Sequence, residues 1–273
     1  MDTQLIQKEK AMVNNENVLL RITDLEMTYD KKDVLHKVSF DVRKGEFLSL
    51  LGPSGCGKTT ILRILIGLLK PSGGTIEKDG EDITNLQPSK RKMGIVFQNY
   101  ALFENMTAVG NVEYALRCKR ENRAKTARQE IRKQAVALLS QLGLGEEINK
   151  KPAQLSGGQQ QRVAIARTLI MQPDIILFDE PMAALDVATR LALRERIKNI
   201  QKDFGTTIIY ITHDQEEAFA MSDRIMVMSE GKIEQLDTPQ NIVNNPANDY
   251  VKDFVLKNIE IKINSLVKYQ KTI

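Results

Sequence analysis

The sequence predicts an α/β protein built around a parallel β-sheet. Three short apolar runs, each close to a helix-like segment, carry this prediction: residues 47–51, 175–178 and 208–211. Strands that are apolar on both sides are typical of a parallel sheet covered by helices on both faces, because neither side of such a strand meets water. A glycine-rich turn at residues 52–57, between the first run and an apolar helix pattern, supports the same architecture.

The N-terminal part of the chain has a different pattern, in which apolar and polar residues partly alternate. Alternation places one side of each strand against a core and the other side in water, which favours an antiparallel sheet. The alternating apolar residues are Leu20, Ile22, Leu25 and Met27 in one segment and Val38, Phe40 and Val42 in the next. We therefore expect an N-terminal antiparallel β-subdomain.

A helical subdomain is expected as an insertion in the α/β core, over about residues 99–156. Apolar residues within it follow the spacing of one helix face, and Gly143 is a plausible stop for that helix. The residues of the face are Ile131, Ala135, Leu138 and Leu142. The stretch 119–133 is densely charged, which favours a solvated helix face; contact with nucleic acid or lipid headgroups is the alternative.

Composition argues against several classes of protein. The 273 residues, 42% of them hydrophobic, suffice for a large core, and a net charge of +4 is too small to indicate a polyanionic partner. No run approaches the roughly 18 to 20 consecutive apolar residues of a membrane span, and residues 1–17 lack an apolar signal core. Cys56 and Cys118 have no metal-ligand spacing. We expect a cytoplasmic, globular protein with free thiols.

A phosphate-binding loop is the clearest chemical feature of the sequence. Residues 52–59 have the spacing glycine, four residues, then Gly-Lys-Thr, between a buried strand and an apolar helix. Glycines allow backbone conformations that side chains forbid, so successive N–H groups can point at phosphate oxygens beside a positive helix N-terminus. The residues expected at the phosphates are Gly52, Pro53, Ser54, Gly55, Cys56, Gly57, Lys58, Thr59 and Thr60.

Three side chains of this loop have more specific expected properties. Lys58 is expected to bridge the β- and γ-phosphates of ATP, and the Thr59 hydroxyl to bind Mg²⁺. Cys56 lies beside this lysine and close to a helix N-terminus, two conditions that lower the pKa of a thiol. We therefore expect Cys56 to be reactive.

An acidic pair completes the expected ATP site. Asp179 and Glu180 follow the apolar run 175–178, and a parallel sheet delivers such residues to the carboxyl edge where ligands bind. Asp179 is expected to hold Mg²⁺, and Glu180 to accept a proton from the water that attacks the γ-phosphate. An acidic pair after a strand also occurs as a helix cap, so the presence of residues 52–59 decides this interpretation.

A Ser-Gly-Gly turn at residues 156–158 precedes another apolar helix pattern. From the residues alone, this turn either offers N–H groups to an anion or forms an ordinary helix cap. The whole run 155–162, Leu-Ser-Gly-Gly-Gln-Gln-Gln-Arg, resembles the signature sequence of ABC transporter ATPases. In that family the turn presses on the γ-phosphate held by the opposite subunit, so the resemblance implies a homodimer. The residues expected at that phosphate are Ser156, Gly157, Gly158 and Gln159.

Other landmarks follow in the family's order. Gln98 resembles the glutamine that touches Mg²⁺ and the attacking water, and His213 resembles the switch histidine that contacts the γ-phosphate. Tyr29 resembles the aromatic residue that stacks on adenine, and residues 184–186, which end at Asp186, resemble the loop that crosses the dimer interface. Without the resemblance, Gln98 would be a surface glutamine, His213 a satisfied polar residue at a strand end, and Tyr29 a packed tyrosine.

The resemblance covers residues 18–246, which we expect to form one ABC ATPase domain. An N-terminal tail, 1–17, precedes it and a C-terminal tail, 247–273, follows it. Many members of that family have an additional C-terminal β-domain, which we expect to be absent here or reduced to a stub. The tail contains three isoleucines that alternate with polar residues like a single strand without partners. These are Ile259, Ile261 and Ile263.

Residues 96–103 and 212–218 resemble the importer branch that serves polyamine, ferric iron, phosphonate, sulfate or sugar uptake. The resemblance implies ATP and Mg²⁺ as cofactors, two permease subunits, and an extracytoplasmic solute-binding protein acting through the permease. It also places the chain at the inner face of the cell membrane.

Polyamine, ferric iron or an organophosphonate are the solutes we expect. An exporter ATPase is one alternative, which residues 214–218 disfavour. A soluble ABC protein acting on nucleic acid or ribosomes is another, which the single cassette disfavours. We therefore expect no nucleic acid partner.

Overall fold

The computed structural model describes residues 17–119, 126–183, 186–257, 259–261 and 264. These residues form two compact units. Unit 1 contains the described residues up to Arg91 and those from Thr207 onward, and unit 2 is the segment Lys92–Thr206. None of the helices in these ranges is long and apolar enough to cross a bilayer.

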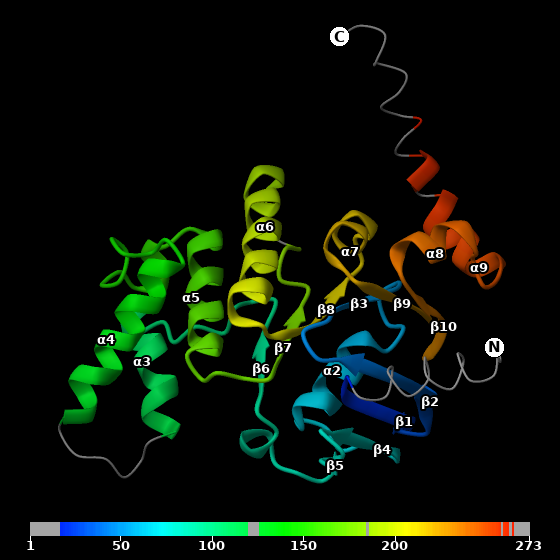
Figure 1. Cartoon of the computed structure of the whole chain (residues 1–273), viewed down its shortest axis with the longest axis horizontal. Helices are drawn as coiled ribbons and strands as arrows, with labels where there is room; N and C mark the ends of the chain where they lie inside the picture. Colours follow the sequence, from blue (N-terminus) through cyan, green and yellow to red (C-terminus); the bar gives the residue numbers. More distant parts are fainter. Residues whose placement is uncertain (1–16, 120–125, 184–185, 258, 262–263, 265–273) are drawn as a thin grey trace, which may run out of the picture. The chain divides into compact units, whose positions relative to one another are not determined.

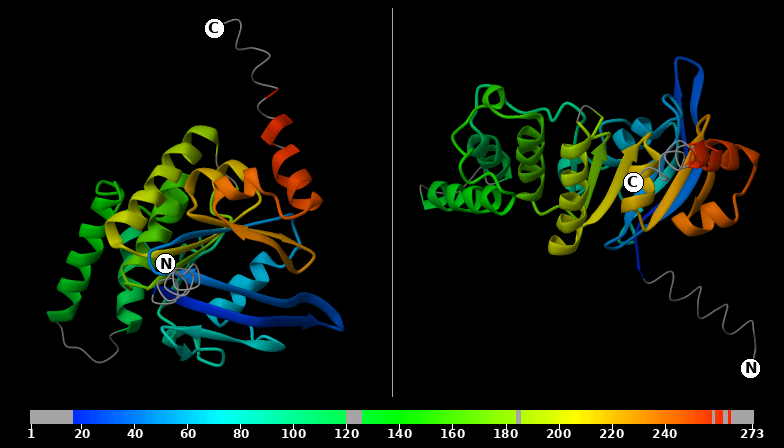
Figure 2. Two further views of the ribbon diagram at one scale, coloured as in Figure 1. Left: turned by 45° about the vertical axis from the view of Figure 1, so that its right-hand side comes forward. Right: turned by 90° about the horizontal axis from the view of Figure 1, so that it is seen from above.

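An antiparallel sheet forms the N-terminal part of unit 1. Strand β1 (Val18–Tyr29) pairs with β2 (Lys32–Arg43) on one side and with β4 (Gly73–Lys78) on the other, and β4 pairs with β5 (Glu81–Asp82). Figure 2 shows β1 and β2 as a long hairpin. The apolar residues of the alternating pattern, including Leu20, Ile22 and Leu25, are buried. The predicted antiparallel β-subdomain is confirmed.

A mostly parallel sheet forms the rest of the strand structure of unit 1. Strand β3 (Phe47–Leu51) pairs in parallel with both β8 (Thr207–Thr212) and β9 (Arg224–Ser229). The edge strand β10 (Lys232–Asp237) runs antiparallel to β9. All residues of β3 and β8 are buried, as expected for strands of a parallel sheet with both faces covered.

Several helical segments belong to unit 1. Helix α2 (Lys58–Ile66) follows β3, and α7 (Gln215–Met221) follows β8. The 3-10 turn η1 (Pro88–Lys90) follows β5, just before unit 2 begins. Three segments follow β10, and Figure 1 shows them in orange to red. They are α8 (Pro239–Asn244), α9 (Asp249–Val251) and the π-helical turn η3 (Lys252–Lys257).

The end of the chain differs from the prediction of a strand. Residues 259–261 are helical, and Ile263 lies outside the described residues. Three isoleucines at alternate positions fit a strand, but Ile259 packs against an apolar cluster that includes residues of β9, α8 and α9, which favours a helical continuation.

Unit 2 combines a parallel strand pair with helices. Strand β6 (Met93–Val96) pairs in parallel with β7 (Ile175–Asp179). Helix α3 (Ala108–Lys119) packs against α4 (Thr126–Gln141) and α5 (Gly157–Leu169), as Figures 1 and 2 also show. The 3-10 turn η2 (Pro152–Gln154) precedes α5, and α6 (Val187–Phe204) completes the unit.

The helices of unit 2 pack through the predicted apolar face. Ile131, Ala135, Leu138 and Leu142 are all buried, and Gly143 adopts φ +71° just beyond α4, so it is the stop that the sequence predicts. Buried Glu113 of α3 accepts hydrogen bonds from Arg117 at 2.5 Å and Arg132 at 3.1 Å. Part of the charged stretch 119–133 lies outside the described residues, but Arg132 joins α4 to α3 rather than projecting freely.

Candidate nucleotide-binding site

The phosphate loop follows β3 and ends at the start of α2, as the spacing predicts. A Cβ added to Gly52 would lie 2.5 Å from the Met228 carbonyl oxygen and 2.8 Å from the Cys56 sulfur, so only glycine fits there. Gly57 precedes α2 with φ +104°, a left-handed conformation that glycine adopts without strain. The glycines therefore shape a loop that packs closely against β9.

Lys58 is the first residue of α2 and is buried within the loop. Its ammonium nitrogen donates to the carbonyl oxygens of Gly52, at 2.7 Å, and Pro53, at 2.9 Å. The first turn of α2 contains no acidic residue that would neutralise the positive helix end. The ammonium group and the helix N-terminus are thus combined at one loop, an arrangement that favours a polyphosphate.

The expectation that the Cys56 thiol has a lowered pKa is wrong. Burial raises the pKa of Cys56, and this effect outweighs the opposing effect of the nearby Lys58 ammonium. The thiol is only 4% exposed, so the thiolate would lose most of its hydration, and the protonated form is favoured. Sequence spacing showed the lysine and the helix end, but it did not show the burial.

The turn between β9 and β10 supports the phosphate loop. Gly231 donates its N–H to the Cys56 carbonyl at 3.2 Å, and its own carbonyl accepts from the His36 N–H at 3.0 Å. A Cβ at Gly231 would lie 2.3 Å from the carbonyl oxygen of Val34. The loop is therefore held by backbone contacts to segments that are distant in sequence.

His213 and Tyr29 are the other predicted site residues of unit 1. Leu51 and Thr212 are in register in neighbouring parallel strands. Gly52 and His213, which follow them, therefore both lie at the carboxyl edge of the sheet. His213 is exposed there. Tyr29 lies at the turn between β1 and β2 and is 38% exposed, so its ring is accessible for stacking.

The acidic pair and Gln98 share one edge in unit 2. Asp179 is the last residue of β7 and Glu180 follows it. Because Val96 and Phe178 are in register in parallel strands, Gln98 and Asp179 emerge from the same end of the pair. Glu180 has φ +44°, a left-handed conformation that is unusual for a glutamate and that often marks a functional position.

The Ser-Gly-Gly turn is a complete helix cap. The Ser156 hydroxyl accepts from the Gln159 N–H at 3.3 Å, and the Gln159 side-chain oxygen accepts from the Ser156 N–H at 2.9 Å. Gln159 also donates to Glu147 at 3.2 Å. Ser156 and Gly157 are exposed, so the cap leaves this end of α5 open to an anion. Both interpretations of the turn, cap and anion site, are compatible with this geometry.

Asp186 begins α6. Its carboxylate accepts from the Thr189 N–H at 3.0 Å and from the Thr189 hydroxyl at 2.6 Å, and these hydrogen bonds lower the pKa of Asp186. Ala184 and Leu185, which belong to the same predicted interface loop, lie outside the described residues. The described part of the loop is therefore a helix cap.

The predicted residues form two groups, one in each unit. Unit 1 contains Tyr29, residues 52–60 and His213. Unit 2 contains the second group: Gln98, Ser156, Gly157, Gly158, Gln159, Asp179, Glu180 and Asp186. Each group lies at a strand end or a helix start.

Comparison with known proteins decides the family. Residues 35–183 match the family model described as ABC transporter, and this range includes the phosphate loop, the Ser-Gly-Gly turn and the acidic pair. The chain belongs to the ABC transporter family. It carries the ATP-binding cassette of that family. The resemblance of residues 155–162 to the ABC signature sequence is thereby confirmed as a family relationship.

Two similar proteins are named as import ATP-binding proteins. The chain is 46% identical over 239 residues to the spermidine/putrescine import ATP-binding protein PotA of Acetivibrio thermocellus, covering 88% of this chain and 66% of that protein. It is 46% identical over 240 residues to the protein of the same name from Mycoplasma capricolum, covering 88% and 67%. The chain thus spans about two thirds of the length of these relatives.

A solved structure confirms the ABC ATPase fold. The ATP-binding cassette MJ0796, described as a dimeric post-hydrolysis state bound to ADP and Pi, matches with a TM-score of 0.72 and 35% sequence identity. The match covers 81% of this chain and 99% of that chain.

The sequence did not predict the contact that holds the segment after Gln98. Tyr100 and Ala101 have φ values of +60° and +46°, and their carbonyl oxygens accept from Arg167 of α5 at 2.9 and 2.5 Å. The same guanidinium lies 5.8 Å from the ring centre of Phe103. Arg167 is 66 positions beyond Ala101, so no local pattern could have revealed the pairing.

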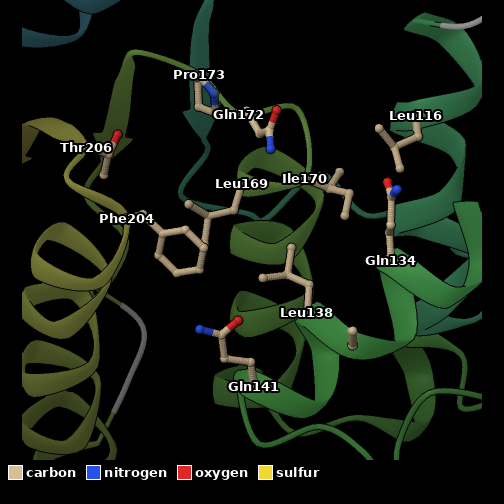
Figure 3. Close-up of a pocket in the computed structure, with 11 residues that line it drawn as sticks. Leu116, Gln134, Leu138, Gln141, Leu169, Ile170, Gln172, Pro173, Phe204 and Thr206 are labelled. Atoms are coloured by element: carbon tan, nitrogen blue, oxygen red, sulfur yellow. The ribbon is translucent and has the colours of Figure 1, made fainter.

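A cavity of about 810 Å³ lies elsewhere in unit 2 (Figure 3). Leu138, Leu169 and Phe204 line it together with uncharged polar residues. Pro173, another lining residue, precedes β7, whereas Asp179 ends that strand. The cavity is therefore at the opposite end of β7 from the acidic pair and is not part of the candidate site.

Proposed function

We propose that this chain is the ATP-hydrolysing subunit of an ABC importer, in which ATP-driven closure of two copies is coupled to solute uptake through a separate permease. The observation that carries the proposal is the phosphate loop, with buried Lys58 and an acid-free helix start, in a chain 46% identical to import ATP-binding proteins. The exporter alternative has no comparable support among these relatives.

Binding of ATP divides among residues of different chemistry. Lys58 and the N–H groups of residues 52–60 bind the phosphates, and Tyr29 stacks on adenine. The hydroxyl of Thr59, the carboxylate of Asp179 and the amide oxygen of Gln98 are the hard oxygen donors that Mg²⁺ prefers. Mg²⁺ in this set would neutralise charge on the β- and γ-phosphates.

Hydrolysis requires a base and a contact to the γ-phosphate. Glu180 accepts the proton of the attacking water, Gln98 orients that water, and His213 donates a hydrogen bond to the γ-phosphate. The left-handed backbone of Glu180 supports this role, because it sets the glutamate apart from the strand that carries Asp179. None of these steps requires a covalent intermediate on the protein.

A second copy of the chain completes each site. The capped turn at residues 156–159 offers the N–H groups of an exposed helix start, and Asp186 belongs to the loop that crosses the interface. The dimeric state described for the related cassette MJ0796 supports a homodimer. Two permease subunits and an extracytoplasmic solute-binding protein complete the importer, with this chain on the cytoplasmic face of the membrane.

A polyamine is the proposed solute. The named relatives are spermidine/putrescine import ATP-binding proteins, which favours polyamine over ferric iron or an organophosphonate. The solute passes through the permease, so no residue of this chain selects it.

Uptake of radiolabelled spermidine in cells that lack this chain tests the proposal. We expect uptake to be lost in the deletion, restored by the wild-type chain, and not restored by Glu180→Gln. Uptake of phosphonate and ferric iron is measured in parallel as a control for solute identity. Unchanged spermidine uptake in the deletion strain would rule out a polyamine importer.

A further inference from the structure

The backbone around His213 is fixed by several short-range hydrogen bonds. The Thr212 hydroxyl donates to the Glu217 carboxylate at 2.9 Å and accepts from the Asp214 N–H at 3.0 Å. The Asp214 carboxylate then accepts from the Glu216 N–H at 2.8 Å and caps α7. These bonds shape the turn, but all of them lie within the turn and α7.

A long-range hydrogen bond fixes the same turn to the C-terminal part of the chain. The side-chain amide of Gln215, the first residue of α7, donates to the backbone carbonyl of Phe254, 39 positions further on. Phe254 lies within η3, a π-helical turn of a kind that is rare and often found at functional sites. Gln215 is two residues from His213.

Packing alone does not explain a glutamine at this position. Gln215 is 7% exposed, and its side-chain oxygen is buried without a hydrogen bond in the described part of the chain. An apolar side chain of similar length would fill the same space without burying an unpaired oxygen. The hydrogen bond to Phe254 is the feature of Gln215 that an apolar residue cannot supply.

We name residues 248–257, which contain α9 and η3, the C-terminal anchor. Val251 and Val255 of the anchor are fully buried in one apolar cluster with Ala218 of α7 and Leu51 of β3. Leu51 directly precedes the phosphate loop. The anchor therefore shares one apolar core with the helix after His213 and with the strand before Gly52.

The C-terminal anchor is itself well fixed. The Asn248 side chain accepts from the Val251 N–H at 2.9 Å and donates to Glu234 of β10 at 2.7 Å. The rings of Tyr250 and Phe254 stack with centres 5.5 Å apart and planes 8° from parallel. A segment held in this way can act as a rigid support for a neighbouring helix.

We propose that Gln215 is a positioning residue, through which the C-terminal anchor holds His213 at the γ-phosphate. The inference rests on the proposed role of His213 in hydrolysis. Two structural links carry it: the amide of Gln215 is bonded to the anchor, and the anchor shares one apolar cluster with α7 and the end of β3. The part of the tail that begins at residue 248 thereby acquires a function that the sequence did not indicate.

Histidine NMR tests the positioning directly, without relying on ATP hydrolysis. The chain has two histidines, His36 and His213, so protein labelled with carbon-13 at the histidine Cε1 gives two signals, which a His36→Gln variant assigns. Gln215→Met keeps the length of the side chain and removes the donated hydrogen bond. We expect the His213 signal to shift or broaden in this variant while the His36 signal stays in place.

A matched control comes from another glutamine that supports the same region. Gln235 of β10 donates to the Asn245 carbonyl at 3.1 Å and accepts from the Ala247 N–H at 2.9 Å, but it has no part in the Gln215–Phe254 bond. Gln235→Ala removes two hydrogen bonds to the segment before the anchor but leaves the Gln215–Phe254 bond in place, so it should leave both histidine signals unchanged. Melting temperatures of the two variants are compared, and Gln215→Glu serves as a second replacement if Gln215→Met does not fold.

The kinetic consequence is a loss of turnover without a matching loss of binding. In Gln215→Met we expect kcat for ATP hydrolysis to fall about tenfold, equivalent to about 1.4 kcal/mol, with the Kd for ATP changed less than about twofold. Gln235→Ala should change both values less than about twofold, because it leaves the Gln215–Phe254 bond in place.

Three results would overturn the inference. An unmoved His213 signal in Gln215→Met and Gln215→Glu would show that Gln215 does not position the histidine. A moved signal with unchanged kcat would show that the positioning does not serve hydrolysis. An equal loss of kcat in Gln235→Ala would show that turnover depends on the stability of this region and not on the Gln215–Phe254 bond. Absence of ATPase activity in the wild-type chain would instead reject the proposed function, while the NMR comparison would still decide the positioning.

Discussion

The chain contains two turns at helix starts that are suited to phosphate, and they are built differently. The loop 52–57 is closed on itself, with buried Lys58 bonded to the carbonyls of Gly52 and Pro53. The turn 156–159 is exposed, and its polar side chains cap their own helix. The first turn is followed by a buried lysine, whereas the residues of the second, Ser-Gly-Gly-Gln, are uncharged and offer N–H groups at a helix start.

This difference indicates that the two turns contribute differently to phosphate binding. A loop with its own cation can hold a polyphosphate, and a bare helix start adds a weaker attraction of roughly 0.3 to 1 kcal/mol at an exposed position. The turn 156–159 therefore contributes when a bound phosphate is brought to it, which is what the proposed closure of two copies accomplishes. Substitutions in the two turns should then have different consequences.

Lys58→Ala should have the largest effect. It removes the buried ammonium at the phosphates, so we expect ATP hydrolysis to fall about a hundredfold or more and nucleotide binding to weaken. Fluorescent nucleotide titration and a phosphate-release assay measure the two quantities. Lys70→Ala, which removes an exposed lysine of the same unit, is the control and should behave like the wild type. Near-normal turnover in Lys58→Ala would remove the basis for assigning this loop.

Glu180→Gln should separate binding from chemistry. The amide cannot accept the proton of the attacking water, so we expect normal ATP binding, a hydrolysis rate lower by about a hundredfold or more, and a long-lived ATP-bound dimer detectable by gel filtration. Glu230 has nearly the same left-handed backbone, φ +43° against +44° for Glu180, so Glu230→Gln controls for the change at this conformation. Equal rates in the two variants would assign the base to another residue.

The local parts of the fold and site could be predicted from the sequence, because their determinants are adjacent in the chain. Buried strands such as Phe47–Leu51 and the glycine positions of the phosphate loop belong to this group. The bonds from Arg167 to Tyr100 and from Gln215 to Phe254 could not be predicted, because they join residues 67 and 39 positions apart.

Two expectations were wrong for physical reasons. Residues 259–261 are helical although apolar and polar residues alternate there, since the short pattern also fits a helix packed against the apolar cluster. Cys56 has a raised pKa because burial outweighs the nearby positive charge. Both errors come from tertiary packing, which adjacent residues do not report.

The rate of cysteine alkylation should depend on pH, and this dependence tests whether the phosphate loop is buried as described. The expected effect is smaller than those of the two substitutions above. The thiolate is the reactive form, and a raised pKa keeps buried Cys56 protonated at neutral pH. Maleimide should therefore modify exposed Cys118 first, and the rate at Cys56 should rise as the pH increases into the alkaline range. Mass spectrometry of the wild type and of Cys118→Ser measures the two rates. Modification of Cys56 as fast as Cys118 at neutral pH would contradict the buried loop.

A mixing experiment tests most directly whether the two turns meet across a dimer. Lys58→Ala subunits are mixed with Ser156→Arg subunits, and separately wild-type subunits are mixed with subunits that carry both substitutions. If sites are shared, the first heterodimer has one intact site and the second has none. If each subunit forms its own site, the second heterodimer has the intact site and the first has none.

Purified heterodimers, isolated with two different affinity tags, are assayed for ATP hydrolysis. The shared-site model predicts activity above the Lys58→Ala and Ser156→Arg homodimers in the first heterodimer, up to about half of the wild-type rate if one site turns over alone. It predicts no such activity in the heterodimer of wild-type and doubly substituted subunits. Activity confined to that second heterodimer would contradict the model, because it would show that Lys58 and Ser156 of the same subunit form the site.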